Sequence, residues 1–238
     1  MIDLTNLSAD CNEVAIDQLC HRAIGPYGTA AAVCVWPRFV SQAHRCLVGT
    51  GVHIATVVNF PDGGVDLAST VTQTRVAIAD GADEIDVVLP YRAFLAGQID
   101  IAAGMIDAVR SAAQSDVLVK VILESGEYPD LNAIRRAAVL AIDHGADFVK
   151  TSTGKTSTSA TLSATVMILD AIRAANRPVG CKPSGGIKTT ADALRYLALA
   201  EEMMGPRWAT ATTFRFGASG LLDDLEATVA TADRMEGE

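Results

Sequence analysis

Short apolar runs recur along the chain, and most of them are continuous rather than alternating with polar residues. Such runs, rich in Val, Ile and Ala, are typical of parallel strands that are buried on both faces. They predict eight strands, at residues 2–5, 31–36, 53–58, 84–89, 117–123, 148–151, 179–182 and 212–216.

Amphipathic segments fill the intervals between these runs. Apolar residues recur there at spacings of three and four positions, as on one face of a helix that packs against a sheet. The expected faces are Leu67, Val71, Thr74 and Ile78 in one helix, Leu131, Ile134, Ala138 and Ile142 in another, and Leu221, Leu222, Leu225 and Val229 in the last.

A repeated tripeptide supports the alternation of helices and strands. Gly81-Ala82-Asp83 and Gly145-Ala146-Asp147 are each expected to close a helix and open a strand. Glycine suits the left-handed position just past a helix end. The separation of 64 residues between the two copies leaves room for two βα units.

The regular series predicts one α/β domain over residues 1–238, because no linker, charge block or low-complexity stretch divides the chain. Eight βα units match a (β/α)8 TIM barrel of parallel strands with an outer ring of helices, which typically takes about 250 residues. An open, doubly wound sheet has the same periodicity and stays open as the alternative.

Composition narrows the classes of partner. The net charge of −9 and the pI of about 4.9 disfavour nucleic acid as a partner, since proteins that bind it usually carry a basic face. Five cysteines without a C-x-x-C pair, together with the absence of a signal peptide, favour a cytoplasmic protein. No apolar run approaches the roughly 20 residues that a membrane span needs.

Polar residues and glycines gather where the predicted strands end. In a barrel these positions surround the active site, at the carboxyl ends of the strands. The residues are Asp3, Thr5, Cys34, Asn59, Asp86, Glu124, Lys150, Lys182, Gly217 and Ser219.

Two lysines among them give the strongest chemical signal. Lys150 and Lys182 end the sixth and seventh predicted strands, and neighbouring strands lie about 4.8 Å apart. Two like charges disfavour each other, so one amine acquires the lowered pKa that a nucleophile needs near neutral pH. With Asp86 as charge partner or proton relay, the set is typical of Schiff-base chemistry. The structural alternative is an ion-pair network inside the barrel, which Glu84 and Lys120 would join.

Glycine-rich segments follow the last three predicted strands. Glycines let backbone N–H groups approach an anion, and barrels often bind phosphate after strands seven and eight. The segments therefore predict a phosphate site, although each also reads as a tight βα turn. They are Thr153-Gly154-Lys155-Thr156, Ser184-Gly185-Gly186-Ile187 and Phe216-Gly217-Ala218-Ser219-Gly220.

Other cofactor and metal motifs find no match. Gly154-Lys155-Thr156 is not a P-loop, because Val149 occupies the position of the required upstream glycine. No G-x-G-x-x-G follows the first strands, and the four histidines form neither H-x-H nor H-E-x-x-H. We therefore expect no dinucleotide and no metal, which disfavours a zinc-dependent aldolase. Cys34 is expected to be a small buried apolar residue.

Longer segments, spread over nearly the whole chain, resemble one family. They are DLT at Asp3, VCVWPRF at Val33, VNFP at Val58, EIDVV at Glu84, KVILESG at Lys120, FVKTSTG at Phe148, KPSGGI at Lys182 and FRFGAS at Phe214. VKTSTG and KPSGGI in this order are highly specific. The sequence resembles the deoxyribose-phosphate aldolases, which are class I (Schiff-base) aldolases and lyases.

The resemblance implies a TIM barrel that cleaves 2-deoxy-D-ribose 5-phosphate reversibly to D-glyceraldehyde 3-phosphate and acetaldehyde, in deoxyribonucleotide and carbohydrate catabolism. It implies Lys150 as the Schiff-base lysine, Lys182 as the residue that tunes its pKa and relays protons, and Asp86 as proton donor and acceptor. No cofactor is implied, and a homodimer is a possible assembly. Residues expected to bind substrate or phosphate are Thr151, Gly154, Lys155, Gly185, Gly186, Gly217, Ser219, Gly220, Asp3 and Thr5.

The chain departs from the family pattern in three places. Gly220 stands where many members carry a second serine, so the last phosphate loop lacks one hydroxyl. The chain ends Arg234-Met235-Glu236-Gly237-Glu238, without the tyrosine that assists proton transfer in some members. Slower turnover or another proton carrier is therefore expected. The N-terminal helix of longer members is expected to be missing.

Two other functions stay open at this point. A sugar-phosphate isomerase would use Asp86 as a base without an imine, so borohydride would trap no substrate on it. A sugar-phosphate sensor would bind without turnover. The paired lysines argue against the sensor, because binding alone needs no second amine.

Overall fold

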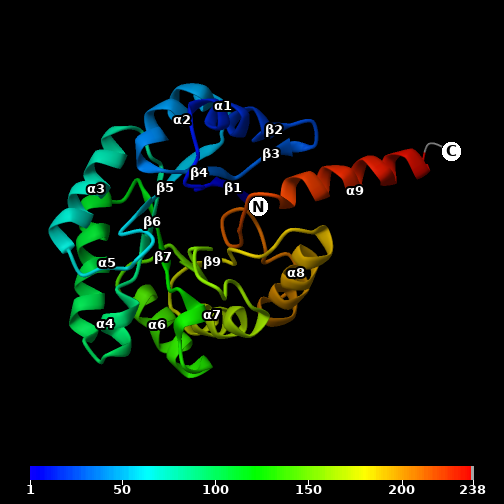
Figure 1. Ribbon diagram of the computed structural model, residues 1–238. Helices are drawn as coiled ribbons and strands as arrows, with labels where there is room; N and C mark the ends of the chain where they lie inside the picture. The colour runs from blue at the N-terminus through cyan, green and yellow to red at the C-terminus, as the bar shows by residue number, and fades with distance from the viewer. Residues whose placement is uncertain (237–238) are drawn as a thin grey trace.

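The continuous apolar runs form a ring of parallel strands in the computed structural model, which describes residues 1–236 (Figure 1). The order around the ring is β10-β1-β4-β5-β6-β7-β8-β9, and bridges from Cys181 to Phe214 and from Ser184 to Gly217 close it. This closure confirms the predicted TIM barrel and excludes the open sheet. The strands are β1 (Ile2–Asn6), β4 (Ala32–Val35), β5 (His53–Val58), β6 (Glu84–Val88), β7 (Leu118–Ile122), β8 (Phe148–Lys150), β9 (Gly180–Lys182) and β10 (Phe216–Ala218).

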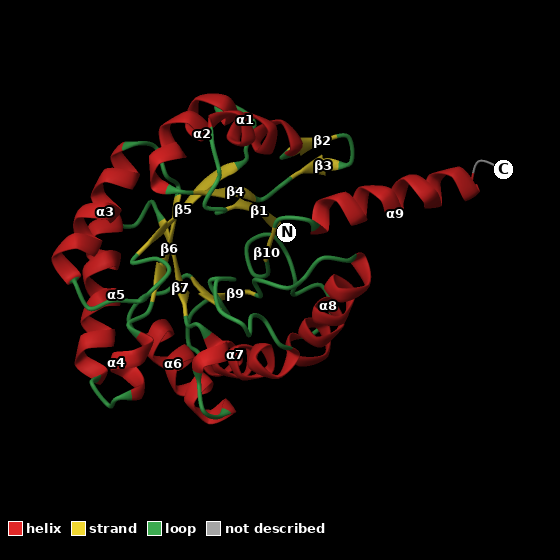
Figure 2. Ribbon diagram, in the orientation of Figure 1, coloured by secondary structure: helices red, strands yellow, loops and turns green. Residues whose placement is uncertain are grey.

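Helices surround the strands on the outside of the ring, and α9 extends away from it (Figure 2). In residues 1–236 no helix is long and apolar enough to cross a bilayer. Gly237 and Glu238, which belong to the tail without a tyrosine, lie outside the described residues. The helices are α1 (Glu13–Arg22), α2 (Val40–Leu47), α3 (Leu67–Ala79), α4 (Tyr91–Leu95), α5 (Ile99–Ala113), α6 (Leu131–Asp143), α7 (Leu162–Ala174), α8 (Thr190–Met204) and α9 (Leu221–Glu236), with 3₁₀ turns η1 (Pro37–Phe39) and η2 (Ser125–Glu127).

The Gly-Ala-Asp repeat forms two equivalent helix–strand junctions. Gly81 and Gly145 follow α3 and α6 with φ of 103° and 97°, a conformation that glycine adopts without strain. Asp83 and Asp147 each accept a backbone N–H of the preceding strand at 2.8 Å. The repeat therefore ends a helix and ties the next strand to its neighbour.

The predicted helix faces are wrong at their ends. Leu67 in α3, Leu131 in α6 and Val229 in α9 are exposed. In α3 Thr74 is buried as predicted, and so is Thr70, which was not on the predicted face. These threonine hydroxyls donate to carbonyls four residues earlier at 2.8 and 2.9 Å. Because their donors are satisfied inside the helix, these threonines can pack against the barrel as apolar residues do.

The last predicted strand is displaced from the observed one. Residues 212–216 were expected to be extended, but β10 begins only at Phe216, because Thr210 closes a turn. The carbonyl of Thr210 accepts the N–H groups of Thr213 at 3.1 Å and Phe214 at 2.7 Å. A two-residue hairpin, β2 (Ile24–Gly25) with β3 (Gly28–Thr29), was also missed.

Packing between β8 and β9 leaves no room for a side chain at Gly180. A Cβ there would lie 2.2 Å from Cε1 of Phe148. We expect Gly180→Ala to lower the free energy of unfolding by roughly 1–3 kcal/mol through overpacking. The matched control is Gly104→Ala in α5, where a Cβ meets nothing within 4 Å and about 0.5–1 kcal/mol is gained. Urea unfolding checks both, and a Gly180→Ala variant as stable as the control would contradict this packing.

Candidate active site

Strand register brings the ionisable side chains together inside the barrel. Asp86 in β6 pairs with Lys120 in β7, and Lys150 in β8 pairs with Lys182 in β9. Residues in register on neighbouring parallel strands point to the same side of a sheet. All four side chains are sealed from solvent, and the most exposed, Lys150, is 2% accessible.

Asp86 is the centre of this group. Its Oδ2 accepts from the Nζ atoms of both Lys150 and Lys182, each at 2.8 Å. Its Oδ1 accepts from Lys120 Nζ at 2.7 Å. The two lysines singled out in the sequence therefore share one carboxylate oxygen, as a nucleophile and its charge partner require.

A second set of ion pairs lies toward the amino ends of the strands. Lys120 Nζ is 2.6 Å from Glu84 Oε2, which confirms that these two residues join an interior network. Arg215 Nη1 lies 2.9 Å from Glu84 and 3.1 Å from Asp3. Lys182 Nζ lies 2.5 Å from Asp3 Oδ2. The two groups form an ion pair, but their angles are not those of a hydrogen bond.

The interior charges cancel only if one amine is neutral. Three carboxylates, those of Asp3, Glu84 and Asp86, face four basic groups in one contiguous cluster. An uncompensated buried charge is costly, so the group least supported by carboxylates is the one that loses its proton. That group is Lys150, which pairs with Asp86 alone. The basic groups are Lys120, Lys150, Lys182 and Arg215.

The Lys150 amine has a lowered pKa. Burial is the largest cause, the Asp86 carboxylate opposes it, and the Lys182 ammonium adds to the lowering. From the sequence, a neighbouring lysine was expected to be sufficient, with desolvation acting in the same direction. In the structure desolvation comes first, and Lys182 contributes less.

The two partners of Lys150 are both held in their charged forms. Burial opposes the ammonium of Lys182, but Asp3 and then Asp86 outweigh it and raise the pKa. Burial likewise opposes ionisation of Asp86, yet Lys120, Lys150 and Lys182 hold its pKa well below the usual range. Lys182 is therefore a fixed cation and Asp86 a fixed anion beside a neutral amine.

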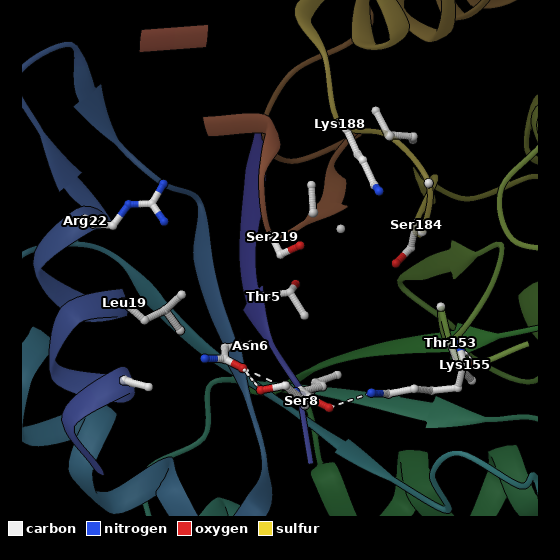
Figure 3. Close-up of a pocket in the computed structure, with 18 of the residues that line it drawn as sticks. Thr5, Asn6, Ser8, Leu19, Arg22, Thr153, Lys155, Ser184, Lys188 and Ser219 are labelled. Atoms are coloured by element: carbon white, nitrogen blue, oxygen red, sulfur yellow. Dashed lines mark hydrogen bonds between the residues drawn. The ribbon is translucent and has the colours of Figure 1, made fainter. Parts of the chain in front are cut away.

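A pocket of about 530 Å³ opens beside the cluster, between the end of β1, α1 and the loops after β8, β9 and β10. It reaches the cluster at Gly217, where an added Cβ would lie 3.1 Å from Lys182 Cε. Figure 3 shows Thr5, Lys155, Ser184 and Ser219 around this space. Its wall includes cationic and hydroxyl side chains together with glycine-rich backbone, which suits an anion.

Most of the predicted binding residues line this pocket. Position 185 requires a glycine for two reasons. Its φ is 87°, and a Cβ there would lie only 2.6 Å from Ser159 Oγ. Its loop can therefore bring backbone N–H groups close to a ligand. The predicted residues that line the pocket are Thr5, Gly154, Lys155, Gly185, Gly186, Gly217 and Ser219.

Three predicted binding residues do not line the pocket within the described chain. Asp3 was expected near the phosphate, but it is fully buried and pairs with Lys182 and Arg215. Thr151 is also buried, and its hydroxyl accepts the Ser184 N–H at 3.0 Å, which braces the loop after β9. Gly220 stands just before α9, outside the lining residues.

Two cations that were not predicted to bind substrate also line the pocket. Lys188 and Arg22 approach from opposite sides in Figure 3, and Arg22 is held 2.5 Å from Asp223. Lys188 directly follows the Ser184-Gly185-Gly186-Ile187 segment, so its place beside a glycine loop was a usable signal. Arg22 gave none, because only the tertiary fold turns that side of α1 toward the barrel mouth.

No metal site emerges from residues 1–236, since no three His, Cys, Asp or Glu side chains group there in a way that could hold an ion. The interior carboxylates of Asp3, Glu84 and Asp86 are all engaged by lysine or arginine. The cluster can instead provide a neutral buried amine, an adjacent carboxylate and a compensating cation. That combination suits attack on a carbonyl carbon.

Comparison with known proteins agrees with this chemistry. The model of the DeoC/LacD family of aldolases matches residues 1–225. A deoxyribose-phosphate aldolase of Agrobacterium fabrum is 55% identical over 227 residues, 94% of this chain and 87% of the relative.

Solved structures give the same picture. A candidate deoxyribose-phosphate aldolase from Coccidioides immitis has a TM-score of 0.83 and 30% identity, over 94% of this chain and 84% of its own. A candidate from Toxoplasma gondii has a TM-score of 0.87 and 26% identity, over 96% and 93%. These matches confirm the resemblance that the sequence motifs indicated: the chain belongs to the DeoC/LacD family of aldolases.

Proposed function

We propose that this aldolase cleaves 2-deoxy-D-ribose 5-phosphate reversibly to D-glyceraldehyde 3-phosphate and acetaldehyde through a Schiff base on Lys150. The observation that carries the proposal is the single oxygen of Asp86 that lies 2.8 Å from both Lys150 and Lys182. The name of the Agrobacterium relative and the cation-lined pocket support a phosphorylated deoxysugar as substrate. The reaction then belongs to cytoplasmic deoxyribonucleotide and carbohydrate breakdown.

Formation of the imine uses the neutral form of Lys150. The Nζ lone pair attacks C1 of the open-chain sugar, and the carbonyl oxygen leaves as water once it is protonated. The product is a protonated imine, which puts a positive charge where the cluster holds a neutral amine at rest. Asp86 Oδ2, 2.8 Å from Nζ, is placed to stabilise that charge.

Cleavage of the C2–C3 bond then follows. A base removes the proton of the C3 hydroxyl, the bonding electrons move toward the imine nitrogen, and D-glyceraldehyde 3-phosphate leaves. Asp86 serves as this base directly or through water; its lowered pKa makes it weak, so proton transfer is coupled to the electron flow into the imine. Protonation of the enamine at C2 and addition of one water release acetaldehyde and restore Lys150.

The phosphate end fixes the sugar in the pocket. Lys155, Lys188 and backbone N–H groups near Gly185 and Gly186 surround the space that this dianion takes. Binding at a distance from the reacting carbon turns affinity into orientation of C1 toward Lys150. In this arrangement Asp3 serves as the counterion of Lys182 and Thr151 as a brace of the phosphate loop.

The first test is borohydride trapping with acetaldehyde, read by peptide mass spectrometry. The chain has five lysines, so the modified site is easily assigned. We expect an ethyl group on Lys150 alone, with loss of retro-aldol activity in parallel. Lys150→Met should abolish both, because the nucleophile is gone while the side-chain volume is kept. Labelling of another lysine, or turnover by Lys150→Met, would contradict the assignment of Lys150 as the Schiff-base lysine.

A second test concerns the charge balance. Lys182→Met leaves Asp3 and Asp86 with one cation fewer, so the excess negative charge favours the ammonium form of Lys150 and raises its pKa. The rate of trapping plotted against pH should therefore rise at higher pH than in the wild type, by about one unit or more. Lys182→Arg retains the positive charge and is the matched control. An unmoved profile in Lys182→Met would exclude this role for Lys182.

A further inference from the structure

Glu124 is a buried acidic residue that the mechanism above does not use. It lies two residues after the end of β7, is fully inaccessible, and has φ 59° and ψ 56°, a left-handed conformation that is uncommon for a residue with a Cβ. No ion pair joins it to any cation in the described part of the chain. A carboxyl group removed from water needs other partners.

All of its partners come from the loop after β8. The Thr153 N–H donates to the two carboxyl oxygens at 3.3 and 3.4 Å, and the Thr153 hydroxyl donates to Oε2 at short range. The Thr156 hydroxyl lies 3.2 Å from Oε1 and 3.1 Å from the Thr158 carbonyl oxygen, so its one proton is shared between these two acceptors. The single side chain of Glu124 thus accepts from three donors across four residues of the loop after β8.

That loop carries part of the pocket wall. Thr153, Gly154 and Lys155 all line the pocket. The Lys155 N–H donates to the Thr153 hydroxyl oxygen at 3.0 Å, and Lys155 Nζ donates to the Leu7 carbonyl at 2.6 Å. The position of the lysine backbone is therefore set by Thr153, and that of Thr153 by Glu124.

Close packing leaves the two loops little freedom to move apart. Next to Glu124, a Cβ on Gly126 would lie 2.2 Å from the Thr158 carbonyl oxygen, so the backbones touch. Gly185 is similarly packed against Ser159 from the other side. The loop after β8 is held between its two neighbours, and Glu124 adds side-chain hydrogen bonds to the contacts that hold it.

We propose that Glu124 is a positioning residue that holds Thr153 and Lys155 where they receive the phosphate of the substrate. It does not line the pocket, so it acts through the loop rather than on substrate. The inference rests on the proposed function in one respect, that the pocket binds the phosphate end of a sugar. Its effect should be confined to phosphorylated substrates.

The experiment compares 2-deoxy-D-ribose 5-phosphate with unphosphorylated 2-deoxy-D-ribose. Glu124→Ala removes all three acceptor contacts, and we expect KM for the phosphorylated sugar to rise about tenfold or more. Activity on the unphosphorylated sugar and the pH profile of trapping should stay as in the wild type. Glu124→Gln keeps one acceptor oxygen, so its KM for the phosphorylated sugar should lie between those of the wild type and Glu124→Ala. The matched control is Glu127→Ala, at an exposed glutamate of the same turn. This substitution should leave the KM for the phosphorylated sugar and the activity on the unphosphorylated sugar as in the wild type.

Equal losses on both sugars would overturn the proposal, as would an unchanged KM for the phosphorylated one. If Glu124→Ala does not fold, Glu124→Gln and Thr156→Val, which deletes one donor, give the same comparison. If the wild type traps no acetaldehyde and cleaves neither sugar, the proposed function has failed. Calorimetric titration with inorganic phosphate then decides about Glu124: weaker binding by Glu124→Gln supports the positioning role, and equal binding refutes it.

Discussion

The barrel interior tolerates ions only as a matched set, and this constraint organises the rest of the structure. Asp3, Glu84 and Asp86 bring three negative charges to a space closed to solvent. Lys120, Lys182 and Arg215 cancel them, which leaves Lys150 as the amine without a carboxylate of its own. Replacing such a cluster with well-packed apolar residues is often neutral or stabilising, so stability alone does not account for seven ionisable side chains in one core. The arrangement is better understood as the means by which an ordinary lysine is kept neutral beside a carboxylate.

Precise register is the structural counterpart of that balance. Lys150 and Lys182 meet at one oxygen because β8 and β9 pair in register, and Asp86 meets Lys120 for the same reason. The bridges between β9 and the β10 region bring Arg215 and Asp3 to the other side of the same cluster. A slip of one residue in β6, β7, β8 or β9 would turn its charged side chain outward and leave the remaining charges uncompensated. The chemistry of the site and the pairing of the strands are therefore not independent.

Much of this was predictable from local pattern. Buried parallel strands leave continuous apolar runs, so seven strands were found nearly in place. The ends of two of them identified Lys150 and Lys182. Asp86 was also identified, although it lies in the middle of β6 rather than at its end. Asp3 was assigned to the phosphate because its role depends on the closure of β1 against β10, which no local pattern records. The misplaced last strand has a different cause: threonine suits strands, but the hydroxyls around Thr210 stabilise a turn. Arg22 was missed because only the packed fold turns it toward the pocket.

The loops above the barrel are interlocked at glycines. Gly126 touches Thr158, Gly185 touches Ser159, and Gly217 would meet Ser184 Oγ at 2.5 Å if it carried a Cβ. The conformation of each loop is thus matched to that of the next loop around the barrel rim. Enlarging the pocket for a bulkier aldehyde by changing one loop alone would leave its neighbour without a fit. Natural divergence and laboratory evolution of substrate range should therefore proceed by linked replacements in adjacent loops, and positions facing each other across these contacts should co-vary.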